Sequence, residues 1–265
     1  MNRYTSLLRS PGPWGARGAG TALIKRLTPY TLPGVFLWLN ADDSTVGDGN
    51  ADGAPRNRIA GGPSPSQATE ANQPLLQVKA GPGGRNEWQF DGTNDRWTFA
   101  NSPAPLTIYL VGKTRRTVNG TAVAVGWEAV SDSQDDGAHV ALNISTGQSR
   151  YVWNTAEGGF TQALVAGTSL DTYVVLAGRR DGTSLTVWRS NSATAGTATI
   201  TGTPNTLTGN AVIGARYVHP SAISGFEQLN LIELIACAAV HPDRLRQQMS
   251  RLLAQRAGLT DISPL

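Results

Sequence analysis

The loop at residues 46–55, VGDGNADGAP, places oxygen-bearing side chains at alternate positions. Asp48, Asn50 and Asp52 occupy these positions and Gly53 follows, which is how a calcium loop of the D-x-N-x-D-G type begins. Such a loop also needs a bidentate carboxylate at its twelfth position, which here is Ile59. Tight loops favour Asp, Asn and Gly whether or not they hold a metal. Two interpretations stay open: a Ca²⁺ site at these three residues, or a loop held by hydrogen bonds.

Paired carboxylates are the groups that would hydrolyse a glycosidic bond. Glu227 and Glu233 have the same strand parity, but six residues of extended chain separate them by about 20 Å. Glycosidases need their two carboxyl groups at roughly 5 to 9.5 Å. The three histidines have neither metal-ligand nor triad spacing, and the sequence contains no G-x-S-x-G elbow. The sequence therefore predicts a protein that is not an enzyme.

Aromatic side chains offer a different chemistry, stacking on the face of a sugar ring. Tyr151 and Trp153 share one face of the segment SRYVWN, and Trp97 lies in the segment DRWTFA. We take these three residues as candidate glycan-binding residues on an exposed sheet. Tryptophans at alternating strand positions are more typical of a sandwich core, and we assign three to it: Trp88, Trp127 and Trp188.

The charges divide the chain into two parts. Residues 1–30 contain five basic residues and no acidic one, whereas the remainder holds 17 basic and 19 acidic residues. The Gly- and Pro-rich stretch PGPWGARGAG cannot form a core, so residues 1–31 are predicted to be an extended arm that becomes ordered on a partner. Trp14 is its expected hot spot. The candidate docking residues are Arg3, Arg9, Trp14, Arg17, Lys25 and Arg26.

Residues 32–265 are predicted to form one domain of short strands. Alternating apolar segments recur from residue 35 onward, and turn sequences such as DGTND, TGQS and RDGTS separate them. RRDGTSLTVWRS is typical of a hairpin with Asp181 and Gly182 at the turn and with Leu185 and Val187 on one face. This pattern predicts an all-β sandwich or jelly roll.

The C-terminal region, residues 242–257, is predicted to be a helix packed on the sandwich. Its apolar stripe follows helical spacing at Leu245, Met249, Leu252 and Leu253. The single cysteine, Cys237, excludes an intrachain disulfide and is expected to be a small buried residue. No segment has the roughly 20 consecutive apolar residues of a membrane helix.

Several segments resemble one known family. VFLWLNADDSTV, ATEANQPLLQ and NEWQFDGTNDRWTF followed by PLTIYLVGK are similar to the opening of concanavalin A-like lectin/glucanase (LamG-type) jelly-roll domains of bacteria and their phages. LNLIELIACAAVHPDRLRQQMSRLLAQRAGL resembles the last strand and closing helix of that family. The resemblance covers residues 35–259 and implies a jelly-roll sandwich, with calcium near a sheet rim in many members. The E-x-D-x-x-E motif of the glucanases does not occur here.

These features favour a structural component of a large assembly over an enzyme. We expect a bacteriophage virion protein (a capsid decoration, head-fibre or tail-associated subunit) that forms a homo-oligomer and docks through its arm. No export signal precedes the domain, so the expected location is the virion, after synthesis in a host cytoplasm. The alternative is an adhesion module that binds a host cell-surface glycan. Five basic residues spread over thirty positions are too sparse for a nucleic-acid site.

Overall fold

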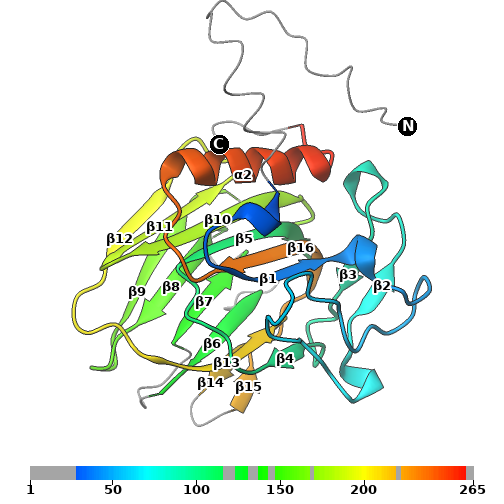
Figure 1. Ribbon diagram of the computed structural model, residues 1–265, viewed down its shortest axis with the longest axis horizontal. Helices are drawn as coiled ribbons and strands as arrows, with labels where there is room; N and C mark the ends of the chain where they lie inside the picture. The colour runs from blue at the N-terminus through cyan, green and yellow to red at the C-terminus, as the bar shows by residue number, and fades with distance from the viewer. Residues whose placement is uncertain are drawn as a thin grey trace, which may run out of the picture.

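The computed structural model describes residues 28–115, 123–130, 137–142, 147–167, 170–218 and 222–260. In this part of the chain two antiparallel sheets pack face to face, and a single long helix lies outside one of them (Figure 1). This arrangement confirms the predicted all-β sandwich with its C-terminal helix. None of the described helices is long and apolar enough to cross a membrane.

The larger sheet has eight strands, and β16 lies at its centre. One edge of β16 pairs with β5, and the other edge pairs first with β3 and then with β1. The strands are, in spatial order, β12 (Gly196–Thr199), β11 (Ser184–Arg189), β10 (Val174–Asp181), β5 (Thr107–Thr114), β16 (Leu229–Cys237), β3 (Glu87–Gln89) and β2 (Leu75–Gln77), with β1 (Val35–Asn40) beside β16.

The second sheet has six strands, and a separate two-stranded hairpin accompanies it. The six strands are, in spatial order, β4 (Trp97–Phe99), β13 (Leu207–Ile213), β6 (Val125–Ala129), β7 (Ala138–Ala141), β8 (Ser149–Asn154) and β9 (Phe160–Val165). The hairpin consists of β14 (Arg216–Val218) and β15 (Ala222–Ser224). Short 3₁₀ turns lie at Pro29–Thr31, Ala41–Asp43, Glu70–Asn72 and Pro82–Gly84.

The predicted β10–β11 hairpin forms with its turn one residue later than expected. Asp181 is still paired, with Ser184, so Gly182 and Thr183 make the turn. Gly182 takes φ of 58°, a left-handed conformation that glycine adopts at little cost. Leu185 and Val187 both enter the main core, as the alternation predicts.

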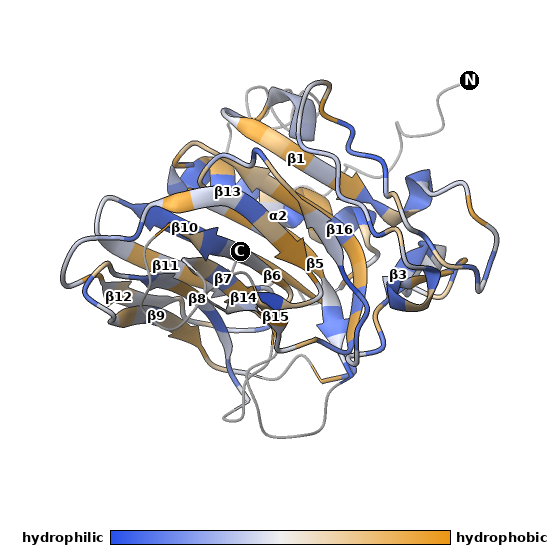
Figure 2. Cartoon of the chain, turned by 90° about the horizontal axis from the view of Figure 1, so that it is seen from below, coloured by the Kyte–Doolittle hydropathy of each residue, from blue (hydrophilic) through white to orange (hydrophobic). Residues whose placement is uncertain are grey.

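Apolar side chains of the two sheets meet in one core, and a second core lies on the outer face of the larger sheet. Figure 2 shows apolar residues following β5, β16 and β1, which are among the strands that contribute side chains to both cores. The helix α2 (Asp243–Arg256) covers this outer face across β10 and β5 (Figure 1). Met249 and Leu253 are fully buried in the second core, with Leu245 and Leu252 packed at its margin. The expected helical stripe is therefore confirmed.

Cys237 lies in the second core, without a disulfide partner, and burial raises the pKa of its thiol to about 12. A thiol with so high a pKa stays protonated and unreactive at neutral pH, because the thiolate is the nucleophile. This agrees with its expected role as a small buried residue.

A buried carboxylate, Glu233, joins β16 to both ends of the described chain. Its side chain is 1% exposed, and it accepts a hydrogen bond of 2.7 Å from Trp38 Nε1. Arg256, the last residue of α2, lies 3.2 Å from the same carboxylate. Burial raises the pKa of Glu233, whereas Arg256 and the Trp38 hydrogen bond act in the opposite direction. The Tyr30 ring, in the turn at Pro29–Thr31, packs edge-on against the Trp38 ring, with 4.7 Å between the ring centroids.

His241 connects the same layers through a neutral imidazole. Its Nε2 donates to the Pro33 carbonyl at 3.0 Å, so its Nδ1 accepts from the Tyr109 hydroxyl at 2.8 Å. The side chain is fully buried, and burial lowers its pKa, although the contact with Pro33 acts the other way. Protonation of His241 would add an N–H at Nδ1, and this donor would face the Tyr109 hydroxyl, which itself donates to Nδ1 in the neutral form.

We expect His241 to make the fold less stable as the pH falls. Its pKa is below the unfolded value of about 6.5, so the unfolded state binds the proton more readily. Its contribution to the free energy of unfolding is full above about pH 7. It decreases on acidification by at most about 1.4 kcal/mol per pH unit. His241→Gln should give a flatter profile between pH 7.5 and 5 in urea unfolding. An unchanged slope in the variant would contradict this assignment.

Candidate functional site

The residues expected to dock onto a partner lie outside the described part of the chain. Arg3, Arg9, Trp14, Arg17, Lys25 and Arg26 all precede residue 28, where the description begins. The docking role of the arm therefore stays a prediction.

The three aromatic residues expected to bind glycan are buried between the two sheets, which corrects that expectation. Trp97, Tyr151 and Trp153 are 0%, 0% and 1% exposed. The Tyr151 hydroxyl donates to the Pro105 carbonyl at 2.8 Å, and Trp97 Nε1 donates to the Asp52 carbonyl. A ring with both faces packed in a core cannot stack on a sugar. Trp88 and Trp127 lie in this core as expected, whereas Trp188 packs on the helix side.

The loop that resembles a calcium site is held by hydrogen bonds, as the second of its two interpretations expects, and the calcium interpretation stays a prediction. Asp52 is buried, and its Oδ2 accepts from Trp88 Nε1 at 2.8 Å and from Ser44 Oγ at 2.7 Å. Its Oδ1 accepts from the Ala54 amide at 3.3 Å. Asp48 is exposed and accepts from the Val78 amide at 2.7 Å.

Asn50 takes part through its backbone, because its carbonyl accepts from the Leu76 amide at 2.9 Å and its amide donates to the Gly47 carbonyl. Within the described ranges, no three side chains of His, Cys, Asp or Glu lie where they could share a metal ion. The hydrogen bonds of Asp52 and Asn50 tie this loop to the core and to β2.

We expect Asp52→Ala to lower the free energy of unfolding by about 2 to 3 kcal/mol, because the buried Trp88 indole and the half-buried Ser44 hydroxyl lose their acceptor. Asp48→Ala, the exposed control in the same loop, should cost below about 1 kcal/mol. Urea unfolding measures both values. If Ca²⁺ raises the Tm of the wild type and of neither variant, the loop binds Ca²⁺ through Asp48 and Asp52.

A groove of about 490 Å³ lies on the outer face of the six-stranded sheet. Its floor comes from β4, β13 and β6, and the β14–β15 hairpin forms one wall. The described lining residues combine hydroxyl, amide and carboxylate groups with one phenol: Ser64, Ser66, Thr98, Phe99, Ala100, Glu128, Asn210, Tyr217 and Ile223.

The hairpin wall is fixed by a third apolar cluster. Val212 of β13 points to the outer face, and Tyr217 and Ile223 of the hairpin pack on it with Phe226. The opposite wall is the segment that contains Ser66, which pairs with Thr98 through two backbone hydrogen bonds of 2.9 and 3.0 Å. Rigid strands thus position both walls.

Glu128 is the charged group of the groove. It is 7% exposed, and its Oε2 accepts from Asn210 Nδ2 at 2.7 Å and from Thr208 Oγ1 at 2.8 Å. These bonds cross from β6 to β13 and orient the carboxylate and the Asn210 amide together. Burial raises the pKa of Tyr217, and the charge of Glu128 raises it further, so the phenol stays a neutral donor at physiological pH.

This arrangement suits a neutral polyhydroxylated ligand. A sugar hydroxyl both donates and accepts, and the groove offers a fixed acceptor at Glu128 together with donors at Asn210 and Tyr217. Ligand sites are commonly concave surfaces of 300–1,000 Å³ with a few fixed polar groups. No sequence pattern indicates this set, because Glu128 lies 82 residues before Asn210 and only strand pairing brings the two side chains together.

No protein-family model matches the chain, and no curated protein matches its sequence. Solved structures do match its fold. A mutant of HCR/D is 8% identical with a TM-score of 0.56, and the match covers 84% of this chain and 52% of that one. The binding domain of Paraclostridial Mosquitocidal Protein 1 is 9% identical with a TM-score of 0.50, covering 84% of this chain and 52% of that one.

The Trypanosoma rangeli sialidase in complex with sialic acid is 12% identical with a TM-score of 0.51, covering 86% of this chain and 34% of the sialidase. The chain thus spans about half the length of the first two proteins and about a third of the third. At these identities the likeness concerns the fold, and it agrees with the sandwich seen here. Membership of the LamG-type family stays a prediction.

Proposed function

We propose that this protein is a non-enzymatic glycan-binding module and that the groove containing Glu128, Asn210 and Tyr217 is its sugar site. The observation that carries the proposal is the fixed hydrogen-bonding set on the outer face of the six-stranded sheet. A carboxylate and an amide held together by a direct bond are preorganised, so little entropy is lost when a sugar binds.

The structural neighbours support the same choice at the level of the fold. One is the binding domain of a larger protein, and another is a sialidase in complex with sialic acid. Glu227 and Glu233, the pair considered for glycoside hydrolysis, support the non-enzymatic part of the proposal. Both are buried, and both have hydrogen-bond donors of their own, Thr114 and Trp38.

The hypothesis of a virion protein docked through its arm depends on residues 1–27, which lie outside the described residues. It stays a prediction, and it is compatible with a displayed glycan-binding sandwich. No described contact favours it over the glycan module.

The test is to apply the full chain to an array of immobilised neutral and acidic oligosaccharides and then to titrate the retained glycan by calorimetry. We expect Asn210→Ala and Tyr217→Phe each to weaken binding by about fivefold, since each removes one hydrogen bond of about 1 kcal/mol. Glu128→Gln should weaken it by about 10- to 100-fold, because the lost acceptor is charged.

Tyr30→Phe is the matched control, because Tyr30 is exposed and lies against Trp38 on the helix side of the molecule. Its affinity should equal that of the wild type, and all variants should keep the wild-type melting profile. Failure to retain any glycan, or groove variants that bind as well as Tyr30→Phe, would overturn the proposal.

A further inference from the structure

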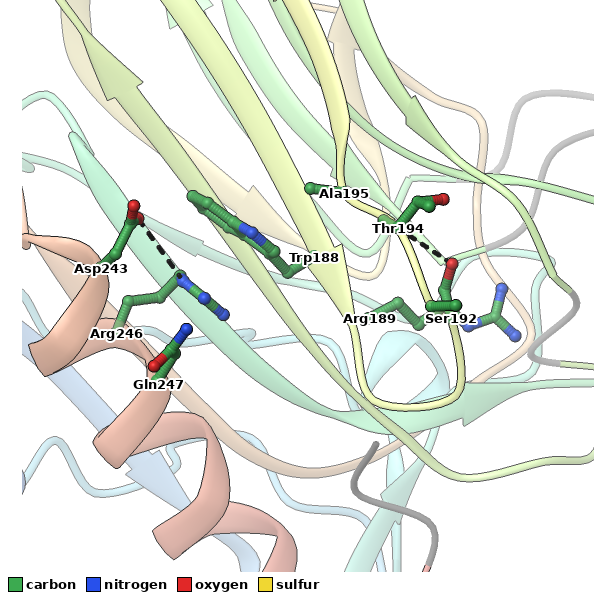
Figure 3. A pocket seen from close by; sticks show the side chains of 9 residues that line it. Trp188, Arg189, Ser192, Thr194, Ala195, Asp243, Arg246 and Gln247 are labelled. Carbon is green, nitrogen blue, oxygen red and sulfur yellow. Dashed lines mark hydrogen bonds and ion pairs between the residues drawn. The ribbon is translucent and has the colours of Figure 1, made fainter. Parts of the chain in front are cut away.

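A second cavity, of about 220 Å³, lies between the first turns of α2 and the segment that joins β11 to β12 (Figure 3). It is on the outer side of the eight-stranded sheet, so it is separate from the groove on the other sheet. Its described lining residues are Trp188, Arg189, Ser192, Ala193, Thr194, Ala195, Asp243, Arg246 and Gln247.

Arg246 is the unusual group in this cavity. Its side chain is 3% exposed, yet its Nε and Nη1 atoms are buried without a hydrogen-bond partner. Figure 3 shows the guanidinium extending from α2 toward Trp188 and into the space between the helix and the strand. Buried guanidinium donors are nearly always paired, because an unpaired one has lost its hydrogen bonds to water without replacement. The geometry therefore points to an acceptor supplied from outside the chain.

Trp188 holds the guanidinium in this position. The carbon of the Arg246 guanidinium lies 4.0 Å from the centre of the Trp188 ring, and that of Arg179 lies 5.0 Å from it. Cation–π contacts of this kind fix the plane of the arginine without using its N–H donors. The Trp188 ring thus makes cation–π contacts with both Arg179 and Arg246, and the N–H donors of Arg246 remain available to the cavity.

The charge around the cavity is positive. Asp243 is the acidic group among the described lining residues, and Arg179 binds it at 2.8 Å, closer than the 4.0 Å to Arg246 Nε. Asp243 is also 64% exposed in its side chain, so water screens its charge. Burial lowers the pKa of Arg246, with Asp243 acting the other way.

The start of α2 adds to this positive field. Pro242 holds the N-cap position and offers no side-chain acceptor, so no side chain caps the helix. The positive end of a helix dipole attracts anions. Thr194 and Gln247 supply a hydroxyl and an amide beside it.

Arg189 also lines the cavity, and its Nε and Nη2 are likewise buried without a partner, but its side chain is directed to the opposite side of the strand. Its Nη1 donates to Ser149 Oγ at 3.3 Å and to the Gly167 carbonyl, and in Figure 3 its guanidinium extends away from α2. The cationic group that faces the cavity from α2 is therefore Arg246.

We propose that this cavity binds the carboxylate of a small acidic ligand about the size of one sugar ring, with Arg246 as the anion-binding residue. A planar guanidinium fork matches a carboxylate in two parallel hydrogen bonds. The volume of about 220 Å³ is below the 300–1,000 Å³ typical of sites for larger ligands. This proposal does not depend on the sugar groove.

The test uses the full chain, D-glucuronate as the probe and D-glucose as its neutral partner, followed by NMR titration. We expect glucuronate to shift the Trp188 indole N–H and the amide signals of Arg246 and Gln247, and glucose to leave them unchanged. Arg246→Gln should weaken glucuronate binding at least tenfold. Arg246→Lys, which keeps the charge but loses the planar fork, should weaken it by several fold.

Arg251→Gln is the control variant, because Arg251 is an exposed arginine on the same helix. It should bind glucuronate as the wild type does, and thermal melting should show that each variant is folded. If Arg246→Gln unfolds, the Arg246→Lys variant carries the comparison. The proposal is overturned by any of three results: equal shifts with glucose, sulfate binding as tightly as glucuronate, or unchanged affinity in the folded Arg246 variants.

Discussion

The buried carboxylate of Glu233 is the interaction on which the helix side of this molecule depends. An isolated carboxylate in a protein interior costs several kcal/mol, so its partners must stay in place. Trp38 brings β1 to it and Arg256 brings the end of α2. Arg85 extends the network, because it pairs with Asp42 and donates to the Arg256 carbonyl at the helix end. β1, α2 and the turn at Ala41–Asp43 are thereby connected through the Glu233 carboxylate and its arginine partners. β16, which carries Glu233, is buried along its whole length.

The two sheets are covered differently, and this difference creates the two candidate sites. A 14-residue helix covers the outer face of the eight-stranded sheet, and the cavity beside Arg246 lies where its first turns meet the β11–β12 segment. On the six-stranded sheet the β14–β15 hairpin packs on Val212 of β13, and beside it the polar groups around Glu128 line an open groove. Most of the outer face of the six-stranded sheet has no helix on it, so it is free to carry polar groups, as antiparallel sheets with one solvated face do.

Most strands and the helix could be predicted, because apolar alternation and helical spacing are local properties. SRYVWN forms β8 with the bounds that its alternation indicates, and the stripe through Met249 and Leu253 identifies α2. The hairpin β14–β15 and strand β9 were not anticipated. Phe160, at the start of β9, is 61% exposed, so its segment does not show the burial pattern of an inner strand. The D-x-N-x-D-G spacing does not by itself indicate a Ca²⁺ site, because the residue types that bind Ca²⁺ also accept hydrogen bonds from a loop and a buried indole, as Asp52 does here.

The sequence by itself determined the fold class, the closing helix and which residues share a strand face. It did not determine which of two faces is the core, because a period of two assigns side chains to faces without naming the buried one. Trp97, Tyr151 and Trp153 accordingly turned out to lie inside the sandwich. The tertiary structure alone decided that Glu128, Asn210 and Tyr217 meet, and that Arg246 lies over Trp188. These contacts join residues that are distant in the chain, and only sheet pairing and helix docking bring them together.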